Sequence, residues 1–438
     1  MQSSAICDSE RLFFLGGRQV KKAMCTLFYM LSSLVMVISE ELILVQTVFR
    51  HGDRAPMRPM TSAESRAYYY RGREHLTNKG LDQAHKLGLS LRQRYVDNGF
   101  LDARYLPSEV VFRSSAVERC LMTASTTASS MFNLTENGHP TAVPIFTVPK
   151  EKDDICRARI RCPFVVDEMK QITGVTDQSV DLQHILDELF AQEAKRLNFT
   201  NIVGKDRIRQ FEPIFLEHDS GLAVPQWFND DARKEADHLL DLTIEFISGT
   251  GRFHNPNWIL TRSGKLLYTI LNNQRKAVEN ALNGTKFFGF TTHDILISPL
   301  LDSMGVLHVA LAPKGRPDFV ATVVFELWRN DTQHYVKVLN RRNTEYNEFT
   351  NLTPMIKSCG GGNACDIKVF EEAVRTFQIE HPEVLCDEPN IKQDSDRNNG
   401  IPALDVFFMV STGLITGLFL ASLAFHVRHR TTREHKAA

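Results

Sequence analysis

The sequence lacks an excess of charge of either sign. Its 51 Lys and Arg residues are matched by 52 Asp and Glu residues, so the charge balance does not point to a nucleic-acid partner. It also has no low-complexity tract and no repeat of solenoid period, and its composition is that of a globular protein. A chain of 438 residues can bury a large core, and one large domain with an insertion is as plausible as two domains.

Metal and nucleotide motifs are missing as well. None of the eight cysteines shows the paired spacing that zinc sites use. The glycine run at residues 360–362 is not followed by Gly-Lys-Ser/Thr, so it is not a P-loop. We therefore expect no metal and no cofactor.

The first 39 residues are typical of an extension followed by a secretory signal peptide. An apolar run over residues 23–38 follows three basic residues and ends beside Ser39, an acceptable cleavage site. An uncleaved signal anchor is the alternative. Met24 is a second candidate start, and the sequence does not decide between it and Met1.

A longer apolar run lies near the carboxyl end. Residues 406–425 carry no charge and are numerous enough to span a bilayer as a helix, although a buried core helix is the alternative. The tail, residues 426–438, is basic, which places it in the cytoplasm by the positive-inside rule and argues against a lipid-anchor signal. We expect a single-pass type I membrane protein, with residues 387–405 as a linker. The larger part would be lumenal or extracellular, at the cell surface or in the endolysosomal system.

The predicted lumenal part carries further signs of a secretory route. N-x-S/T sequons occur at Asn133, Asn198, Asn283, Asn330 and Asn351. Its cysteines are Cys120, Cys156, Cys162, Cys359, Cys365 and Cys386. An even number of cysteines in an oxidising compartment predicts disulfides, but six of them permit many pairings.

Hydrophobic periodicity predicts an α/β fold interrupted by a helical segment. Residues 40–150 and 255–386 alternate strand and helix patterns, as in a central mixed sheet flanked by helices. Helical patterns dominate residues 151–254, where no strand is convincing. We predict that this segment is a mostly helical inserted domain.

Polar residues follow three of the predicted strands. The apolar run 43–49 stops at Arg50-His51-Gly52-Asp53-Arg54, and Pro56 rules out further regular strand. Residues 109–112 lead to Arg113, just before a helix, and residues 286–292 lead to His293-Asp294, again before a helix. Ligands bind at such strand ends in open α/β sheets, and helix starts favour anions.

These residue types suit the hydrolysis of phosphate esters. The guanidinium groups of Arg50, Arg54 and Arg113 match the charge and geometry of phosphate oxygens. His51 is a plausible in-line nucleophile, which would form a phosphohistidine that water then hydrolyses. Taken alone, Arg113 is more typical of a surface salt bridge.

The leaving alkoxide needs an acid, and two aspartates compete for that role. Asp294 is preferred because a carboxyl near the departing oxygen can be neutral under acidic conditions. Taken alone, it could equally serve the start of its helix. Asp53 lies between Arg50 and Arg54, so we expect a depressed pKa there and a poorer acid.

The motif RHGDRAP at residues 50–56, with Arg113 and the later TTHD, resembles the signature of the histidine acid phosphatase family. Residues 76–95, LTNKGLDQAHKLGLSLRQRY, resemble the helix that follows this signature in the family. The likeness covers roughly residues 41–386. With a signal peptide and one carboxyl-terminal span, the chain looks most like the lysosomal and prostatic branch.

The resemblance implies a role for each matching residue. His51 would be the nucleophile and Asp294 the proton donor, while the phosphate would be bound by Arg50, Arg54, Arg113 and His293. It also implies the disulfides Cys162–Cys386 and Cys359–Cys365, which leaves Cys120 and Cys156 either paired or free. A homodimer is compatible with it.

Two features depart from the family pattern. Ile295 follows Asp294 where the family usually has threonine, and the tail has no tyrosine for lysosomal sorting. We predict an acid phosphatase that hydrolyses small phosphate monoesters through a phosphohistidine. A phytase or inositol polyphosphate phosphatase is one alternative, and it would need a pocket richer in Lys and Arg. A catalytically inactive binding ectodomain is another, but every expected catalytic group is present.

Overall fold

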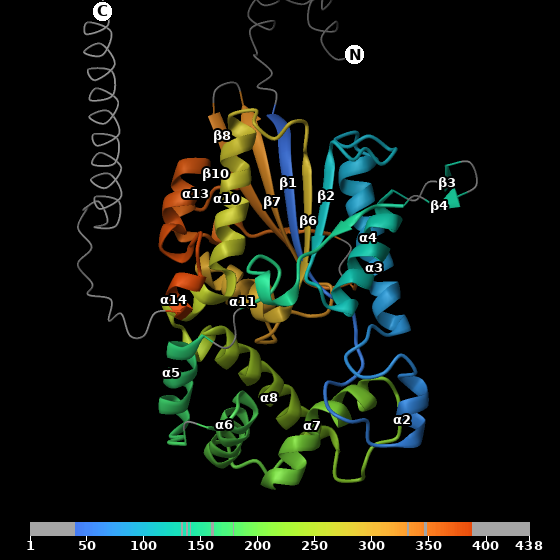
Figure 1. Ribbon diagram of the computed structural model, residues 1–438, viewed down its shortest axis with the longest axis vertical. Coiled ribbons are helices and arrows are strands. Elements are labelled where there is room, and N and C mark those ends of the chain that lie inside the picture. The colour runs from blue at the N-terminus through green and yellow to red at the C-terminus, as the bar shows by residue number, and fades with distance from the viewer. Residues whose placement is uncertain are drawn as a thin grey trace, which may run out of the picture. The chain divides into compact units, whose positions relative to one another are not determined.

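The computed structural model describes residues 40–387, apart from 133–134, 137–138, 141, 159–161, 178, 331–332 and 346–347. At its centre is an eight-stranded sheet in the order β10-β8-β7-β1-β6-β2-β5, with β9 paired to β8 (Figure 1). Its strands are β1 (Glu40–Arg50), β2 (Val110–Ser114), β5 (Ile145–Phe146), β6 (Phe287–Thr292), β7 (Thr322–Asn330), β8 (Gln333–Arg341), β9 (Thr350–Asn351) and β10 (Cys365–Asp366). Two further short strands, β3 (Thr135–Glu136) and β4 (His139–Pro140), form a separate pair.

Strand β1 lies in the middle of the sheet, and the helices on both faces explain its apolar sequence. It pairs in parallel with β6 and antiparallel with β7, so the sheet is mixed, as predicted. Leu44 and Val48 enter the core on one face, and Val45 and Phe49 enter the core on the other. Successive side chains of a strand point to opposite faces, so a strand covered on both sides is mostly apolar.

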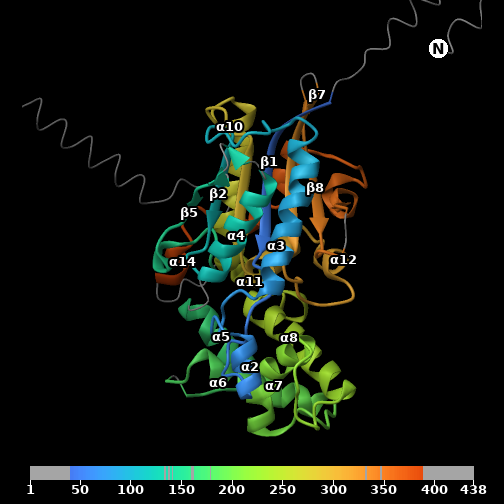
Figure 2. The ribbon, with the colours of Figure 1, turned by 90° about the vertical axis from the view of Figure 1, so that its right-hand side faces the viewer.

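Helices cover the two faces of the sheet unequally. The helices α3 (Asn78–Leu91) and α4 (Glu118–Met131) pack on one face. The opposite core contains residues of α10 (Lys265–Val278), α11 (Asp294–Ser303), α12 (Leu307–Leu311) and α13 (Ile367–Ala373). Figure 2 shows α3 and α4 in front of the strands. The predicted arrangement of a central sheet flanked by helices is therefore confirmed.

Below the sheet in Figure 1, four helices pack around a core of their own. They are α5 (Pro163–Thr173), α6 (Leu182–Arg196), α7 (Gly204–Asp219) and α8 (Asp230–Ser248), followed along the chain by the short α9 (Pro256–Ile259). The loop after β1, which contains α2 (Ala63–Tyr68), is bound to them. The buried carboxylate of Glu217 on α7 accepts hydrogen bonds from the backbone N–H of Thr61 (2.9 Å) and from Ser65 Oγ (2.5 Å).

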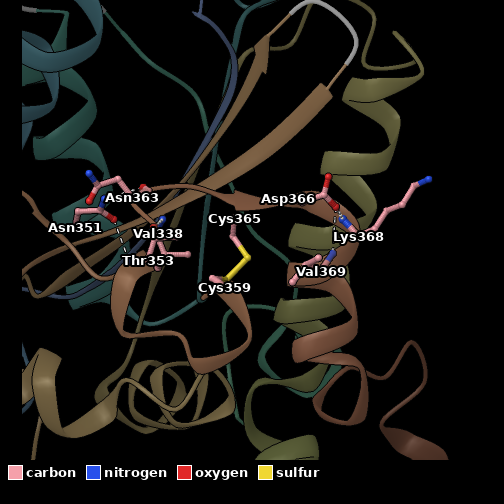
Figure 3. Close-up of a disulfide and its surroundings, with 9 residues drawn as sticks. All are labelled: Val338, Asn351, Thr353, Cys359, Asn363, Cys365, Asp366, Lys368 and Val369. Carbon is pink, nitrogen blue, oxygen red and sulfur yellow. Dashed lines mark hydrogen bonds between the residues drawn. A yellow bond between two sulfur atoms is a disulfide. The ribbon is translucent and has the colours of Figure 1, made fainter. Parts of the chain in front are cut away.

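Both disulfides implied by the resemblance are present. Cys162–Cys386 joins the start of α5 to α14 (Glu383–Asp387), and Cys359–Cys365 closes a short loop that leads into β10 (Figure 3). In the same view Asn351 Nδ2 donates to the carbonyl of Asn363 (2.8 Å) across this loop. Cys120 and Cys156 are free thiols, and both are buried.

The chain ends lie beyond the residues whose positions can be described. Within the ranges given above, no helix is long and apolar enough to cross a membrane. The expected signal segment, the linker from residue 388 onward, the span 406–425 and the tail 426–438 all fall outside these ranges, as does Asn133.

Candidate active site

The structure brings the ends of β1 and β6 together at the carboxyl edge of the sheet, next to the insertion helices (Figure 1). His51 follows β1, and its backbone N–H donates to the carbonyl of Thr292, the last residue of β6 (3.1 Å). His293 and Asp294 come next and start α11. The rings of His51 and His293 lie 5.5 Å apart, edge to face.

The turn after His51 is shaped by a close approach between two glycines. A Cβ on Gly52 would lie 2.5 Å from the carbonyl oxygen of Gly80 in α3, and one on Gly80 would lie 2.2 Å from the carbonyl oxygen of Asp53. Glycine at both positions therefore lets α3 touch this turn. Gly52 N–H donates to Thr123 Oγ1 (3.1 Å), which ties the turn to α4 as well.

The hydrogen bonds of His51 define which ring nitrogen is free. Nδ1 lies 2.8 Å from the carbonyl oxygen of Gly52. A carbonyl can only accept, so Nδ1 carries the proton and Nε2 keeps its lone pair. Burial lowers the pKa of His51 well below its ordinary value, and the positive charges of Arg119 and Arg50 add to this effect. The imidazole is thus neutral and nucleophilic even in acid.

Arg50 is buried in the site and held by three contacts. Its Nη2 lies 2.5 Å from Asp294 Oδ2, its Nη1 donates to the carbonyl of Pro317 (2.7 Å), and the ring of Phe319 packs 4.4 Å from its guanidinium carbon. Burial lowers the pKa of Arg50 to about 10, so it stays charged at acid pH. Its Nε is buried without a hydrogen-bond partner in the described part of the chain, as expected of a donor that binds a phosphate oxygen.

The two candidate acids differ in environment, and one expectation from the sequence was wrong. The pKa of Asp53 is raised, because burial outweighs the hydrogen bond from Thr77 Oγ1 (2.5 Å) and the nearby positive charges. Burial works in the same direction on Asp294, but Arg50 and His293 bring the pKa of Asp294 below its ordinary value. The choice between them therefore rests on position: Asp294 contacts Arg50, whereas Asp53 is bound at the start of α3.

Arg54 reaches the insertion. Its Nη1 lies 3.0 Å from Glu212 Oε1 on α7 and also donates to the carbonyl of Ala55 (2.9 Å). Both of these contacts are made through Nη1.

Arg113 is not placed as the sequence suggested. It lies within β2, and its Nη2 binds the fully buried carboxylate of Asp153 (3.1 Å). The cation that acts most strongly on both His51 and His293 is Arg119, in the first turn of α4. Arg119 Nε is buried and has no partner among the described residues. Sequence reasoning missed this residue, although its place at a helix start beside a strand end was a usable signal.

His293 completes the inner site. Its Nε2 lies 3.2 Å from Ser115 Oγ and 3.6 Å from the thiol sulfur of Cys120. Burial and the charge of Arg119 lower the pKa of His293 to about 3, so this ring is also neutral. No cluster of three or more His, Cys, Asp or Glu side chains able to hold a metal occurs in the described ranges.

Sequence comparisons place these residues in a known context. The family model described as histidine phosphatase superfamily (branch 2) matches residues 41–341. The chain is 33% identical over 380 residues to "Putative acid phosphatase 1" of Caenorhabditis elegans, covering 83% of this chain and 87% of that protein. It is 25% identical to lysosomal acid phosphatase of Xenopus laevis (81% of each chain) and 25% identical to human prostatic acid phosphatase (77% of this chain, 86% of that protein).

Solved structures share the fold at lower identity. The apo form of Hafnia alvei phytase superposes with a TM-score of 0.52 at 16% identity, covering 80% of this chain and 99% of that one. The phytase of Klebsiella sp ASR1 gives 0.53 at 15% identity, covering 82% and 98%.

Proposed function

The chain belongs to branch 2 of the histidine phosphatase superfamily, and we propose that His51 is the nucleophile with which this acid phosphatase attacks phosphate monoesters. The observation that carries this assignment is the hydrogen bond from His51 Nδ1–H to the carbonyl of Gly52. It leaves Nε2 unprotonated, close to the positive charges of Arg119 and Arg50. The lone pair of Nε2 forms a bond to phosphorus, and the bond from phosphorus to the alcohol oxygen breaks. The positive charge that develops on the ring is stabilised through Nδ1–H and the Gly52 carbonyl.

Arg50, Arg54 and Arg119 neutralise the equatorial phosphate oxygens. The buried Nε atoms of Arg50 and Arg119, which have no hydrogen-bond partner among the described residues, support this role. Arg113 Nε is also without such a partner, but the guanidinium of Arg113 is bound to Asp153. Fixed donors of this kind stabilise the transition state without reorganisation of solvent. His293 is neutral and supplies a further hydrogen bond from its ring.

Asp294 protonates the leaving alkoxide. In the free enzyme this carboxylate forms an ion pair with Arg50. A bound phosphate dianion takes its place on the arginine, which removes the main cause of its low pKa and adds a negative neighbour. Both changes favour the protonated acid. In the second step Asp294 takes a proton from water, whose oxygen attacks phosphorus as the bond to Nε2 breaks.

Trapping of the phosphoenzyme tests the assignment of His51. Rapid quenching of the wild type in alkaline denaturant, during turnover of substrate labelled at phosphorus, is expected to yield protein-bound label that is stable in alkali and labile in acid. His51→Ala is expected to lose both this label and turnover of p-nitrophenyl phosphate. Full activity in the His51→Ala variant would refute the assignment of His51 as the nucleophile.

The same proposal extends to the setting of the enzyme. Anchoring through residues 406–425, with the catalytic part lumenal or extracellular, is supported by the apolar run and its basic tail. Glycosylation is favoured by the exposed positions of Asn198 and Asn283. Protease protection of the tail in sealed vesicles, together with a mass shift on deglycosylation, tests both points. That the enzyme forms a homodimer stays a prediction.

A further inference from the structure

Arginines around the phosphate site are paired with acidic side chains. The pairs are Arg54 with Glu212, Arg58 with Asp187, Arg119 with Glu74, and Arg316 with both Asp237 and Asp241. All of these carboxylates except that of Glu74 come from the insertion helices α6, α7 and α8. The sequence therefore supplies many cations to this region, and the insertion neutralises most of them.

Glu212 is the carboxylate of the insertion that contacts Arg54, a proposed phosphate ligand. One carboxylate oxygen lies 3.0 Å from Arg54 Nη1 and 3.1 Å from the backbone nitrogen of Met57. The other lies 3.2 Å from the same backbone nitrogen and 3.4 Å from that of Arg58. Because both oxygens are engaged and the side chain is only 13% exposed, Glu212 holds a fixed position on the outer edge of Arg54.

This position has a consequence for the choice of substrate. A phosphate bound to Arg50 and the inner edge of Arg54 leaves the rest of the ester facing outward, toward the insertion. A second phosphate on the same substrate molecule would lie near the negative charge of Glu212. It would not find an unpaired cation there, because Glu212 already pairs with Arg54. Like charges brought together in a partly desolvated site cost binding free energy. Sites for polyanions need the opposite arrangement, a surface with one sign of charge.

We propose that Glu212 is a specificity-determining residue that restricts the site to esters carrying a single phosphate group. This inference rests on the proposed function, because it takes Arg54 as a phosphate ligand. It also makes the helical insertion, and not the sheet, the part of the molecule that sets selectivity by charge.

Two substrates that share a carbon skeleton test the proposal. Wild-type enzyme is expected to hydrolyse fructose 6-phosphate with a higher kcat/KM than fructose 1,6-bisphosphate, and to turn over phytate poorly. In Glu212→Gln the ratio is expected to shift toward the bisphosphate by about tenfold, mainly through KM, at low ionic strength. Added salt is expected to reduce the difference.

Glu235→Gln is the matched control. Glu235 belongs to α8 and, like Glu212, accepts backbone N–H groups, but these belong to residues 200–202 and not to the loop after β1. Its substrate ratio is expected to equal that of the wild type. An unchanged ratio in folded Glu212→Gln, or the same change in both variants, would overturn the proposal.

An experiment on the wild type covers the case in which Glu212→Gln does not fold. Inositol hexasulfate is a polyanion without a hydrolysable phosphate ester. It is expected to inhibit the hydrolysis of p-nitrophenyl phosphate only at concentrations well above the KM for p-nitrophenyl phosphate. Tight competitive inhibition would overturn the assignment of Glu212. Wild-type enzyme that hydrolyses none of these phosphate esters would instead refute the proposed function.

Discussion

The two histidines of the site are kept neutral by the arginines that surround them. For His51 and His293 alike, burial is the largest cause of the lowered pKa and Arg119 is the next. An ordinary histidine is protonated below about pH 6.5 and could not attack phosphorus in acid. The same cations that bind phosphate therefore also preserve the nucleophile, which links substrate binding to the acid pH range.

The role of Arg119 can be separated from that of Arg113 by substitution. Arg119→Gln is expected to lower kcat/KM for p-nitrophenyl phosphate by about a hundredfold, since it removes a donor to the phosphate. It also removes a positive charge, so the pKa of His51 rises and the acid limb of the kcat/KM profile moves to higher pH. Steady-state kinetics across the acid range measure both effects.

Arg113→Gln is the matched control for this prediction. Its guanidinium is bound to Asp153, so the main expected effect is on stability, because a buried carboxylate loses its partner. The acid limb is expected to stay in place. A shift in Arg113→Gln but not in Arg119→Gln would restore the prediction made from the sequence.

The choice of Asp294 over Asp53 as the acid is open to a leaving-group test. Asp294→Asn is expected to slow hydrolysis of alkyl phosphates by about a hundredfold or more, because an alkoxide needs a proton to depart. p-Nitrophenolate leaves without one, so p-nitrophenyl phosphate is expected to be affected much less. Asp53→Asn is the comparison, and it is expected to slow both esters by a similar factor. Discrimination between the esters in Asp53→Asn alone would reverse the assignment.

At the scale of elements, the sequence was most informative where strands end. Residues 43–49 and 286–292 are rich in apolar side chains because both faces of the sheet are covered, and the polar residues that follow them enter the site. Arg113 also follows an apolar run, but it is still part of β2 and its guanidinium binds Asp153. Arg119 lies within an amphipathic helix, where a single arginine has the same pattern as any solvated residue. Its place in the first turn, just after a strand end, is the one local signal, and the packing of α4 on the sheet brings it to the site.

The contact between α3 and the turn after β1 gives a prediction at this scale. In Gly80→Ala the new methyl group would lie 2.2 Å from the carbonyl oxygen of Asp53, so either the helix or the turn must move. We expect a loss of about 2 kcal/mol in the free energy of unfolding and a drop in kcat, because the turn carries His51. Urea unfolding and kinetics at saturating substrate measure the two effects.

Gly88→Ala offers a comparable clash elsewhere on the same helix. Its methyl group would lie 2.4 Å from the carbonyl oxygen of Thr127 on α4. A similar loss of stability is expected, while kcat of the folded fraction stays close to that of the wild type. Equal losses of kcat in the two variants would show that the contact of α3 with the turn after β1 has no particular effect on catalysis.

At the scale of the whole molecule, the helical character of residues 151–254 was predictable, but the attachment of these helices to the loop after β1 was not. Helical spacing in the sequence identifies α6 and α8, each of which presents an apolar face to the core that the insertion helices share. Glu212 and Glu217 appear in the sequence as ordinary charges on a solvated face, yet both bind the loop after β1. Such partners are more than a hundred residues apart, and no local pattern encodes them. The disulfide partners likewise came from the resemblance alone.

The two disulfides are expected to differ in what they stabilise. Cys162–Cys386 spans 224 positions of the chain and ties the insertion to α14, whereas Cys359–Cys365 spans 6. If closing a loop restricts mainly the unfolded chain, the first is worth about 5 kcal/mol and the second about 2 kcal/mol. The double variant Cys162→Ala/Cys386→Ala is therefore expected to have the lower Tm and the lower urea midpoint. Both double variants are expected to keep kcat while folded, since neither bridge contains a residue of the proposed site. A lower Tm for Cys359→Ala/Cys365→Ala would mean that the loop leading into β10, and not the attachment of the insertion, limits the stability of the molecule.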